Sequence, residues 1–356
     1  MKPIIIISGV ELCVDRISGI QRYMIETLRN INIYLQKNPQ TFEVRLCYPE
    51  GSQLLISDFK SINMIPLKYN GKGWNTRILK QYVDSEHGIF CGLSNNITLC
   101  KDSIILLHDV RSLETVAYDS FKECMIFRLS CGFISFFAKT IVTVSEYQQR
   151  TICSKLHIPQ KSVEVFYAGY EHIDRVGCDA SVFDAFPTIN TNNYYYSLGS
   201  VAKHKNYKWI LEVARRNPDK QFVVAGSQLK EKWRTSADDF KNENIIYIGY
   251  VTDEQNKALL KECKAFVQPS FYEGFGLPPL EALVLGKPIM VSSATCLPEI
   301  YGGIATLFDP NDYSVDLNDI HIPTFDEISQ MKYRYSWKRV AADWVELFRK
   351  SCEVET

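Results

Sequence analysis

Short apolar runs alternate with amphipathic stretches along this chain, in two separate blocks. Residues 3–8, 103–110 and 140–145 in the first block are nearly continuous apolar runs, which are typical of strands covered on both faces. Residues 222–227 and 265–270 show the same pattern in the second block. Alternation of such strands with helices predicts an α/β fold with two parallel sheets, and ligands bind beyond the carboxyl ends of strands in such sheets.

Helices are predicted between and after these strands, at 145–158, 206–216, 253–263, from about 279, and at 336–350. The stretch 171–192 is polar and broken by Gly, Pro and Asn, so it is predicted to be a linker. The expected organisation is therefore a first α/β domain over 1–175, a second over 190–335, and a C-terminal helix over 336–356.

The bulk composition excludes several classes of protein. The chain has 356 residues and a formal charge of -1, which offers no global attraction to nucleic acid. Its 11 scattered cysteines indicate reduced thiols in a cytoplasmic protein. The run at 3–8 is too short for a signal peptide. The apolar segment 125–138 contains Arg128 and is shorter than the roughly 20 residues that span a bilayer, so we expect a buried helix, with a membrane-surface helix as the alternative.

The segment FYEGFGLPPLEALVLGKP, at 271–288, is expected to be a loop followed by a helix that begins near two prolines. The free N–H groups of such a helix start attract anions, and Gly274 and Gly276 let a ligand approach the backbone. Glu273 and Glu281 can accept hydrogen bonds from hydroxyls. A nucleotide sugar, which is anionic and rich in hydroxyls, satisfies both features. A glutamate in the first turn of a helix also occurs without any ligand.

The whole string resembles the signature of the retaining glycosyltransferases of family 4, in which two glutamates are separated by seven residues. Glu273-Gly-Phe-Gly-Leu-Pro-Pro-Leu-Glu281 matches it without a break, and ALVLGKPIMVSS, CLPEIYGG and LFDP match further along. The resemblance implies the GT-B fold, with two Rossmann-like domains facing across a cleft and a last helix that crosses back to the first domain. It implies that Glu273 contacts the donor sugar and that Glu281 holds the ribose.

The same resemblance assigns roles to backbone groups and to a basic segment. It implies that the N–H groups of Phe275, Gly276 and Leu277 bind the sugar and the diphosphate. SLGSVAKHKNY, at 197–207, is similar to a family segment that binds the donor, which implies roles for Ser200 and for Lys205 on the diphosphate. His204 stands where the family has arginine, so that role falls on Lys203 or is partly lost. A solvated helix start is the alternative for Lys203 and His204.

Two features of the first block also resemble the family. DRISGIQRY, at 15–23, is similar to its glycine loop, which implies that Gly19 lies near the donor phosphate or the acceptor. A flexible loop with a helix cap at Ser18 is an equal alternative. His108 ends an apolar run, where the family often has His-Asp, and the resemblance places it near the transferring sugar. A lone histidine at a strand end is more often structural.

No metal requirement is expected for catalysis. No Asp-x-Asp triplet follows a predicted strand, and Asp238 and Asp239 are adjacent in a polar stretch. Lys205 and the helix start can stabilise the departing diphosphate in place of a metal. We therefore predict no cofactor besides the donor substrate.

The favoured hypothesis is a retaining hexosyltransferase that uses GDP-mannose or a UDP-hexose. Its acceptor would be a glycan or a lipid-linked saccharide in cell-surface polysaccharide or lipopolysaccharide assembly, with peripheral contact at the inner face of the membrane. The first alternative is a catalytically inactive glycan-binding or partner subunit. A nucleotide-sugar epimerase or a phosphorylase of similar fold is the second, although no persuasive pyridoxal phosphate site is found. Dinucleotide binding is disfavoured because no GxGxxG follows the first strand.

Overall fold

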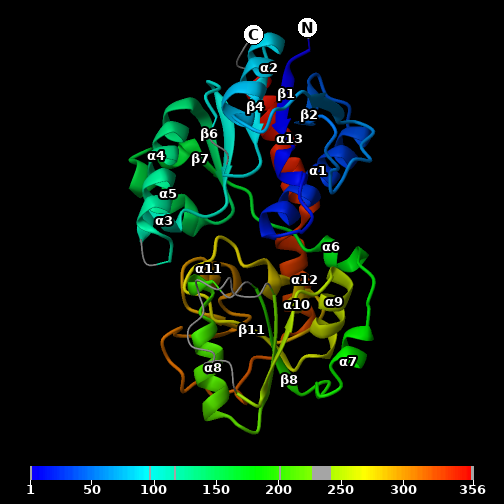
Figure 1. Cartoon of the computed structure of the whole chain (residues 1–356), viewed down its shortest axis with the longest axis vertical. Coiled ribbons are helices and arrows are strands. Elements are labelled where there is room, and N and C mark those ends of the chain that lie inside the picture. The colour runs from blue at the N-terminus through cyan, green and yellow to red at the C-terminus, as the bar shows by residue number, and fades with distance from the viewer. Residues whose placement is uncertain (1, 96–97, 116–117, 200–201, 227–241, 354–356) are drawn as a thin grey trace. The chain divides into compact units, whose positions relative to one another are not determined.

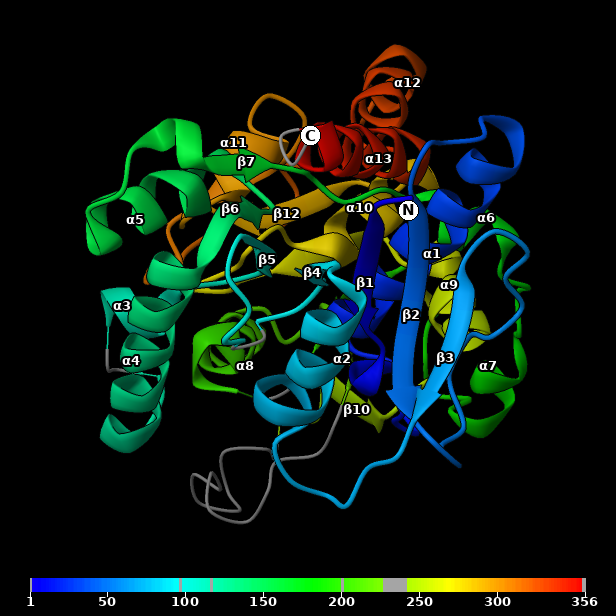
Figure 2. The same ribbon diagram turned by 90° about the horizontal axis from the view of Figure 1, so that it is seen from above.

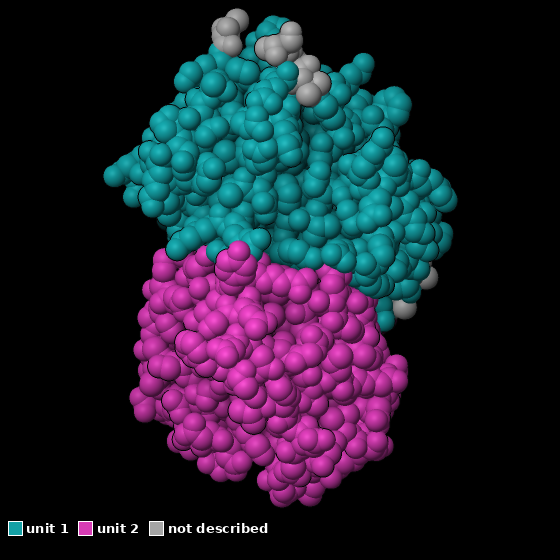
Figure 3. Space-filling model, turned by 180° about the vertical axis from the view of Figure 1, so that it is seen from behind, with its two compact units in different colours: residues 1–169, 336–356 teal, residues 170–335 magenta. Residues whose placement is uncertain are grey.

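The computed structural model of the chain describes residues 2–95, 98–115, 118–199, 202–226 and 242–353. It divides into two compact units, which Figure 3 shows in two colours. Unit 1 comprises residues 1–169 and 336–356, and unit 2 comprises residues 170–335. Each unit contains its own parallel sheet, so the predicted α/β class is confirmed.

Unit 1 is built on a seven-stranded parallel sheet in the order β3-β2-β1-β4-β5-β6-β7. The predicted apolar runs form its central strands, and every residue of β1 is buried. The sequence did not indicate β3 and β4. The strands are β1 (Ile4–Ser8), β2 (Glu43–Pro49), β3 (Asn63–Leu67), β4 (Ile89–Gly92), β5 (Ser103–Leu107), β6 (Ala138–Thr143) and β7 (Val163–Val165).

Helices cover the sheet of unit 1. One core cluster joins Ile4 and Ile6 of β1 to Leu79 and Val83 of α2 and to Ile134 of α4. Ser18 is the N-cap of α1, as the sequence predicted, and its N–H donates to Gln21 Oε1 at 3.1 Å. The helices are α1 (Gly19–Lys37), α2 (Leu79–Glu86), α3 (Arg111–Glu114), α4 (Phe121–Phe137), α5 (Glu146–Leu156) and α13 (Trp337–Glu353), with short turns at Val10–Leu12, Trp74–Ile78 and Gln160–Ser162.

The C-terminal helix α13 belongs to unit 1 and runs alongside α1 (Figures 1 and 2). Its aromatic side chains pack on residues from the start and the end of the first block. The ring of Trp337 lies 5.3 Å from that of Tyr23, and the ring of Trp344 lies 5.1 Å from that of Phe166. These aromatic contacts make α13 part of the core of unit 1.

The chain leaves unit 1 and returns to it at adjoining points. A Cβ added at Gly169 would lie 2.0 Å from the backbone N of Trp337, closer than any side chain allows. Only glycine therefore fits at the last residue of the first segment. Unit 2 is inserted between two parts of unit 1 that touch each other.

Unit 2 is built on a six-stranded parallel sheet in the order β10-β9-β8-β11-β12-β13. The chain first adds β9 and β10 on one side of β8, and then adds β11, β12 and β13 on the other side. Neighbouring strands β8 and β11 therefore flank the point at which the direction of winding reverses. The strands are β8 (Tyr194–Leu198), β9 (Gln221–Ala225), β10 (Ile245–Gly249), β11 (Ala265–Gln268), β12 (Ile289–Ser292) and β13 (Thr306–Phe308).

The stretch predicted to be a linker, 171–192, contains two short helices, so that prediction was wrong in part. It belongs to unit 2, where Ile173 and Val182 are buried. The helices of unit 2 are α6 (Glu171–Arg175), α7 (Ser181–Ala185), α8 (Tyr207–Arg216), α9 (Asp253–Glu262), α10 (Leu277–Val284), α11 (Leu297–Tyr301) and α12 (Phe325–Arg334), with a 3₁₀ turn at Lys203–Lys205.

The apolar segment 125–138 forms most of α4, as predicted, but that helix is not buried all round. Leu129, Phe133 and Phe136 are exposed. Within the described ranges, every helix is either too short or too polar to cross a bilayer.

Candidate functional site

The reversal point between β8 and β11 is where a parallel sheet of this kind binds its ligands, because the loops that leave the two strands diverge there. The loop after β8 carries Lys205, and the loop after β11 carries Glu273. The topology alone therefore brings two of the predicted site residues to one place.

Lys205 and Glu273 form an ion pair at this edge of the sheet. The Lys205 Nζ lies 2.8 Å from Glu273 Oε1 and 2.9 Å from Oε2, so the ammonium bridges both carboxylate oxygens. Oε1 also accepts hydrogen bonds from Gln268 Nε2 and Ser270 Oγ, both at 2.6 Å. Glu273 is buried, whereas 27% of the Lys205 side chain is exposed. The exposed part of the pair is therefore the cation.

These contacts fix the protonation state of Glu273. Burial alone raises the pKa of the carboxyl, but the charge and hydrogen bonds of Lys205, with the hydroxyl of Ser270 and the charge of His204, lower it below its usual value. The carboxyl is consequently ionised at neutral pH. An ionised carboxylate with these partners is a fixed acceptor and has no proton to donate.

The loops after β8 and β11 are tied together by backbone and amide contacts. Phe271 N–H donates to His204 O at 2.7 Å. Asn206 is buried and donates from Nδ2 to Pro269 O at 3.0 Å and to Pro310 O at 2.8 Å. Its φ of 55° is left-handed, which asparagine tolerates. Asn206 thus positions Lys205 by holding its loop.

The loop after β12 holds the backbone of Glu273. Its N–H donates to Thr295 Oγ1 at 3.2 Å, and the Cys296 thiol donates to its carbonyl at 3.3 Å. The stretch around Cys296 is the downstream sequence that resembles the family. Its local role here is to fix the position of the first glutamate.

Helix α10 begins at Leu277, with prolines in its first turn, as the sequence predicted. Gly276 precedes it with a φ of 85°, and a Cβ there would lie 2.8 Å from Leu297 Cδ2. The hydroxyl of Tyr301 donates to the carbonyl of Gly276. Phe275 is buried, and its ring lies 5.4 Å from that of Tyr335. Packing within unit 2 therefore explains the glycine and the buried phenylalanine, and their predicted ligand contacts stay predictions.

Glu281 lies inside α10 and is held by two buried partners. Its Oε1 lies 2.8 Å from His172 Nε2, and its Oε2 accepts from Asn256 Nδ2 at 3.2 Å. Because a carboxylate can only accept, His172 is the donor. The Tyr196 hydroxyl donates to Asn256 Oδ1 at 2.9 Å and so orients that amide. All four side chains are buried.

Sequence reasoning missed His172 and Asn256. His172 lies on α6, inside the stretch predicted to be a linker, and that prediction concealed it. Asn256 lies on α9, at a position that faces the core of an amphipathic helix. A buried asparagine among apolar residues needs hydrogen-bond partners. Its core-facing position on the predicted helix was therefore the signal that could have identified Asn256.

The other predicted site residues lie elsewhere in the chain. His108 and Gly19 belong to unit 1, whereas Lys205 and Glu273 belong to unit 2. Ser200, Asp238 and Asp239 lie outside the described residues. Lys203 is exposed and His204 is partly buried, so the substitute for the family arginine stays a prediction.

His108 follows β5 and is half-buried. Burial lowers the pKa of its imidazole to about 4, against the opposing effect of the Leu93 carbonyl 3.2 Å from Nε2. Its ring lies 5.0 Å from that of Tyr23. The imidazole is therefore neutral at physiological pH. Gly19 opens α1, where a Cβ would meet no described atom within 4 Å, so packing does not require glycine there.

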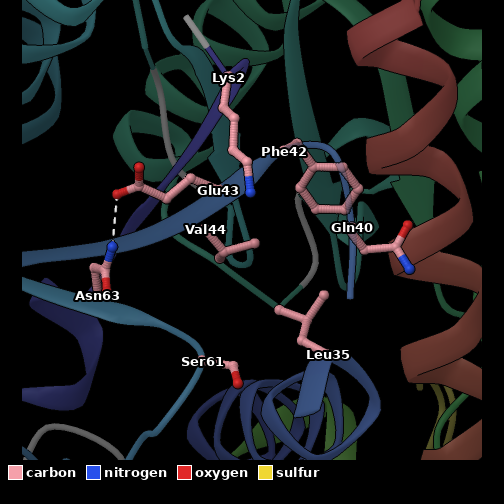
Figure 4. A pocket seen from close by; sticks show the side chains of 8 residues that line it. All are labelled: Lys2, Leu35, Gln40, Phe42, Glu43, Val44, Ser61 and Asn63. Carbon is pink, nitrogen blue, oxygen red and sulfur yellow. Dashed lines mark hydrogen bonds between the residues drawn. The ribbon is translucent and has the colours of Figure 1, made fainter. Parts of the chain in front are cut away.

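A small hollow of about 240 Å³ lies in unit 1, and Figure 4 shows the side chains around it. It is found where β2 and β3 begin, and Asn63 Nδ2 donates there to Glu43 Oε1 at 2.6 Å. This is the amino end of the sheet, opposite the edge at which such sheets bind ligands. The lining residues are Lys2, Leu35, Gln40, Phe42, Glu43, Val44, Ser61 and Asn63.

In the part of the chain that the structure describes, no three His, Cys, Asp or Glu side chains are grouped so that they could hold a metal ion.

Residues 182–316 match the model of the family described as glycosyl transferases group 1. The matched range contains the loops after β8, β11 and β12 and the whole Lys205–Glu273 pair. The family match, together with the relatives below, supports a glycosyltransferase.

Two curated relatives are mannosyltransferases of Escherichia coli. O-antigen chain mannosyltransferase B is 29% identical over 214 residues, which are 57% of this chain and 54% of the relative. Serotype-specific mannosyltransferase WbdA is 47% identical over 68 residues, which are 19% of this chain and 8% of the relative. The chain thus matches about half of the length of the first relative and less than a tenth of the second.

Sucrose-phosphate synthase of Thermosynechococcus elongatus has a similar fold. Its TM-score is 0.73 at 13% sequence identity, with 98% of each chain covered. At this identity the likeness shows the fold alone. It confirms the predicted GT-B fold, with two Rossmann-like α/β domains in one chain.

Proposed function

We propose that this chain is a retaining glycosyltransferase that moves mannose from a nucleotide diphosphate sugar to a glycan or lipid-linked saccharide. Its place would be the assembly of a cell-surface polysaccharide, as the names of the O-antigen relatives suggest. GDP-mannose is the first donor to test, and a UDP-hexose is the alternative.

The observation that carries this proposal is the Lys205–Glu273 pair at the reversal point between β8 and β11. A partly exposed ammonium held by a buried carboxylate is a fixed positive charge at the ligand-binding edge of the sheet. The helix start of α10 adds partial positive charge beside Glu273. Both features suit a diphosphate, whose negative charge increases as it leaves the sugar.

The proposed roles are those that the resemblance to the family 4 signature implies. Lys205 neutralises the diphosphate, with Ser200 and the N–H groups of Phe275, Gly276 and Leu277 as further donors. Glu273, an ionised acceptor held in place by its neighbours, accepts from donor-sugar hydroxyls. Glu281 accepts from the ribose hydroxyls.

In the proposed reaction, the bond between the sugar C1 and the phosphate oxygen breaks, and the electron pair goes to the diphosphate. The acceptor hydroxyl oxygen forms the new bond to C1 on the same face. Its proton goes to a phosphate oxygen of the departing group. Glu273 is ionised, so it does not act as an acid in this scheme. His108, neutral at physiological pH, is proposed to contact the transferring sugar, and Gly19 the donor phosphate or the acceptor.

We also propose that catalysis needs no metal, because Lys205 and the α10 start supply the positive charge. The rate of transfer should then be unchanged when EDTA replaces added Mg²⁺ or Mn²⁺. Loss of transfer in EDTA with recovery on adding the metal would refute this part. The configuration of the product, read from the NMR coupling of the new anomeric proton, tests retention.

The first experiment measures the melting temperature with a panel of nucleotides and nucleotide sugars, for wild type, Glu281→Ala and the control Glu243→Ala. Glu243 is an exposed glutamate of unit 2 outside the site. A ligand at 100 times its Kd adds about 2.7 kcal/mol, or roughly 5–10 °C for a unit of this size. We expect a guanosine diphosphate compound to shift wild type and the control, and Glu281→Ala to lose the shift.

The alternative function is a catalytically inactive glycan-binding or partner subunit. It predicts that no nucleotide or nucleotide sugar shifts the wild type, even at millimolar concentration. Nucleotide binding without hydrolysis or transfer of the donor, across a panel of mannose-terminated acceptors, would also favour it. Peripheral contact with a membrane is part of the proposal, because a lipid-linked acceptor resides there.

A further inference from the structure

Helix α4 of unit 1 has two apolar faces that point in opposite directions. Cys124, Phe127, Cys131 and Ile134 recur at steps of three and four residues and face the core of the unit. The other face carries six exposed large apolar side chains, which we call the α4 stripe: Phe121, Met125, Ile126, Leu129, Phe133 and Phe136. An amphipathic surface helix would carry polar side chains there.

The α4 stripe is unusual for this chain. Its six residues lie on one 17-residue helix, whereas the other exposed large apolar residues among those described are scattered over both units. Phe136 is 79% exposed. Figures 1 and 2 both show α4 at the outer edge of the unit, with the neighbouring helices α3 and α5 beside it. A continuous exposed apolar patch of this kind marks an interaction surface.

The charges near the α4 stripe select an anionic partner. Lys122 is exposed within the stripe near its beginning, and Lys139 is exposed just beyond the end of the helix. The acidic residue of the helix, Glu123, is engaged at the N-cap, where Oε2 accepts from Ser120 N at 2.9 Å. The α4 stripe therefore combines apolar side chains with Lys122 near its beginning, and Lys139 of β6 follows the end of the helix; basic residues accompany apolar ones in helices that lie in a membrane interface in the same way.

The exposed apolar area of the α4 stripe is compatible with a lipid surface. Phe121, Phe133 and Phe136 are 73%, 50% and 79% exposed, and an aromatic side chain has about 150–250 Å² of surface, so these three expose about 300–500 Å². A stable protein interface buries roughly 800 Å² on each partner, so a second copy of the chain would have to cover more than these three rings. An interfacial helix inserts its apolar face at the boundary between headgroups and acyl chains, and Lys122 within the stripe favours anionic lipid over a second copy.

We propose that the α4 stripe docks unit 1 on an anionic lipid surface, with α4 lying in the plane of the membrane. Lys122 and Lys139 contact lipid phosphates, and the phenylalanines insert beside them. In the proposed function, α4 would be the part of the chain that meets the membrane. The docking proposal rests on the exposed residues of α4 and does not depend on the transfer reaction.

Co-sedimentation with vesicles tests this proposal. The full chain is mixed with vesicles of phosphatidylethanolamine and phosphatidylglycerol, or of pure phosphatidylcholine. The variant Leu129→Ser/Phe136→Ser is compared with the control Phe325→Ser/Tyr333→Ser on α12, a pair that is on average more exposed than the stripe pair. We expect wild type and control to bind the anionic vesicles, and the stripe variant to bind at least roughly tenfold less.

Three outcomes would overturn the proposal. Wild type does not bind the anionic vesicles, or the stripe variant binds them as wild type does, or binding is equal on phosphatidylcholine and unaffected by Lys122→Gln. A dimer in sedimentation velocity that only the stripe variant loses, without vesicle binding, would assign the α4 stripe to a second copy. Nucleotide-induced melting shifts of the stripe variant are measured in parallel, and they report on the proposed function separately.

Discussion

Replacing Lys205 with methionine should make the stability of unit 2 depend on pH in the opposite sense to wild type. In wild type, the pKa of Glu273 lies below its usual value, so its ionised form stabilises the fold at neutral pH. That contribution is lost as the pH falls through the folded-state pKa. In Lys205→Met, the effect of burial is no longer offset by the ammonium, and the pKa rises. Ionised Glu273 then costs stability, and acidification relieves that cost.

The size of the effect follows from the exposure of the pair. Breaking a fully buried ion pair costs about 3–5 kcal/mol. Lys205 is 27% exposed, so we expect about 2–3 kcal/mol at neutral pH, or roughly 5–10 °C in Tm. The deficit relative to wild type should shrink as the pH is lowered from neutral to mildly acidic values, because Glu273 becomes protonated in the variant.

Urea unfolding of wild type, Lys205→Met, Glu273→Gln and the double variant over this pH range measures both quantities. In Glu273→Gln the amide keeps the shape and removes the charge, so Lys205→Met should cost much less in that background. A deficit that is the same at every pH, or the same in the Glu273→Gln background, would show that lost packing of the lysine stem is responsible. The reasoning from the ion pair would then be wrong.

Three further predictions concern neighbouring parts of the fold. His172→Ala should leave Glu281 with one buried donor fewer and weaken the nucleotide-induced melting shift, whereas His172→Gln, which keeps a donor, should restore part of it. Gly276→Ala combines a left-handed φ with a 2.8 Å approach to Leu297 and should lower stability by about 1–3 kcal/mol, read from the urea midpoint. Trp344→Ala should cost about 3–5 kcal/mol through the cavity it leaves in unit 1, read in the same way.

The central strands and the first glutamate loop were predictable because their signals are local. The buried apolar run of β1 and the prolines in the first turn of α10 can each be recognised from a few consecutive residues. The edge strand β3 was missed because Pro66 and its exposed positions interrupt the pattern, and β4 because its short apolar run lies between Gly88 and Gly92. The continuity of the apolar pattern decided which strands the sequence revealed.

The contacts between distant segments could not be predicted. His172 meets Glu281 across 109 positions of the sequence, and nothing near either residue signals the other. The α4 segment was predicted to be buried because apolar composition does not say how many of its faces the rest of the chain covers. Lys205 and Glu273 were each singled out, but their pairing follows from the strand order β8-β11, which the sequence leaves open.

The insertion of unit 2 into unit 1 has a consequence for folding during synthesis. A ribosome that has just made Gly169 has produced all seven strands of the first sheet, but α13 lies about 170 residues downstream. At about 5–20 residues per second, α13 emerges roughly 10–30 s later. During that interval Tyr23 and Phe166 lack their ring contacts with Trp337 and Trp344. The nascent first sheet therefore exposes an unfinished aromatic core until the last helix is synthesised.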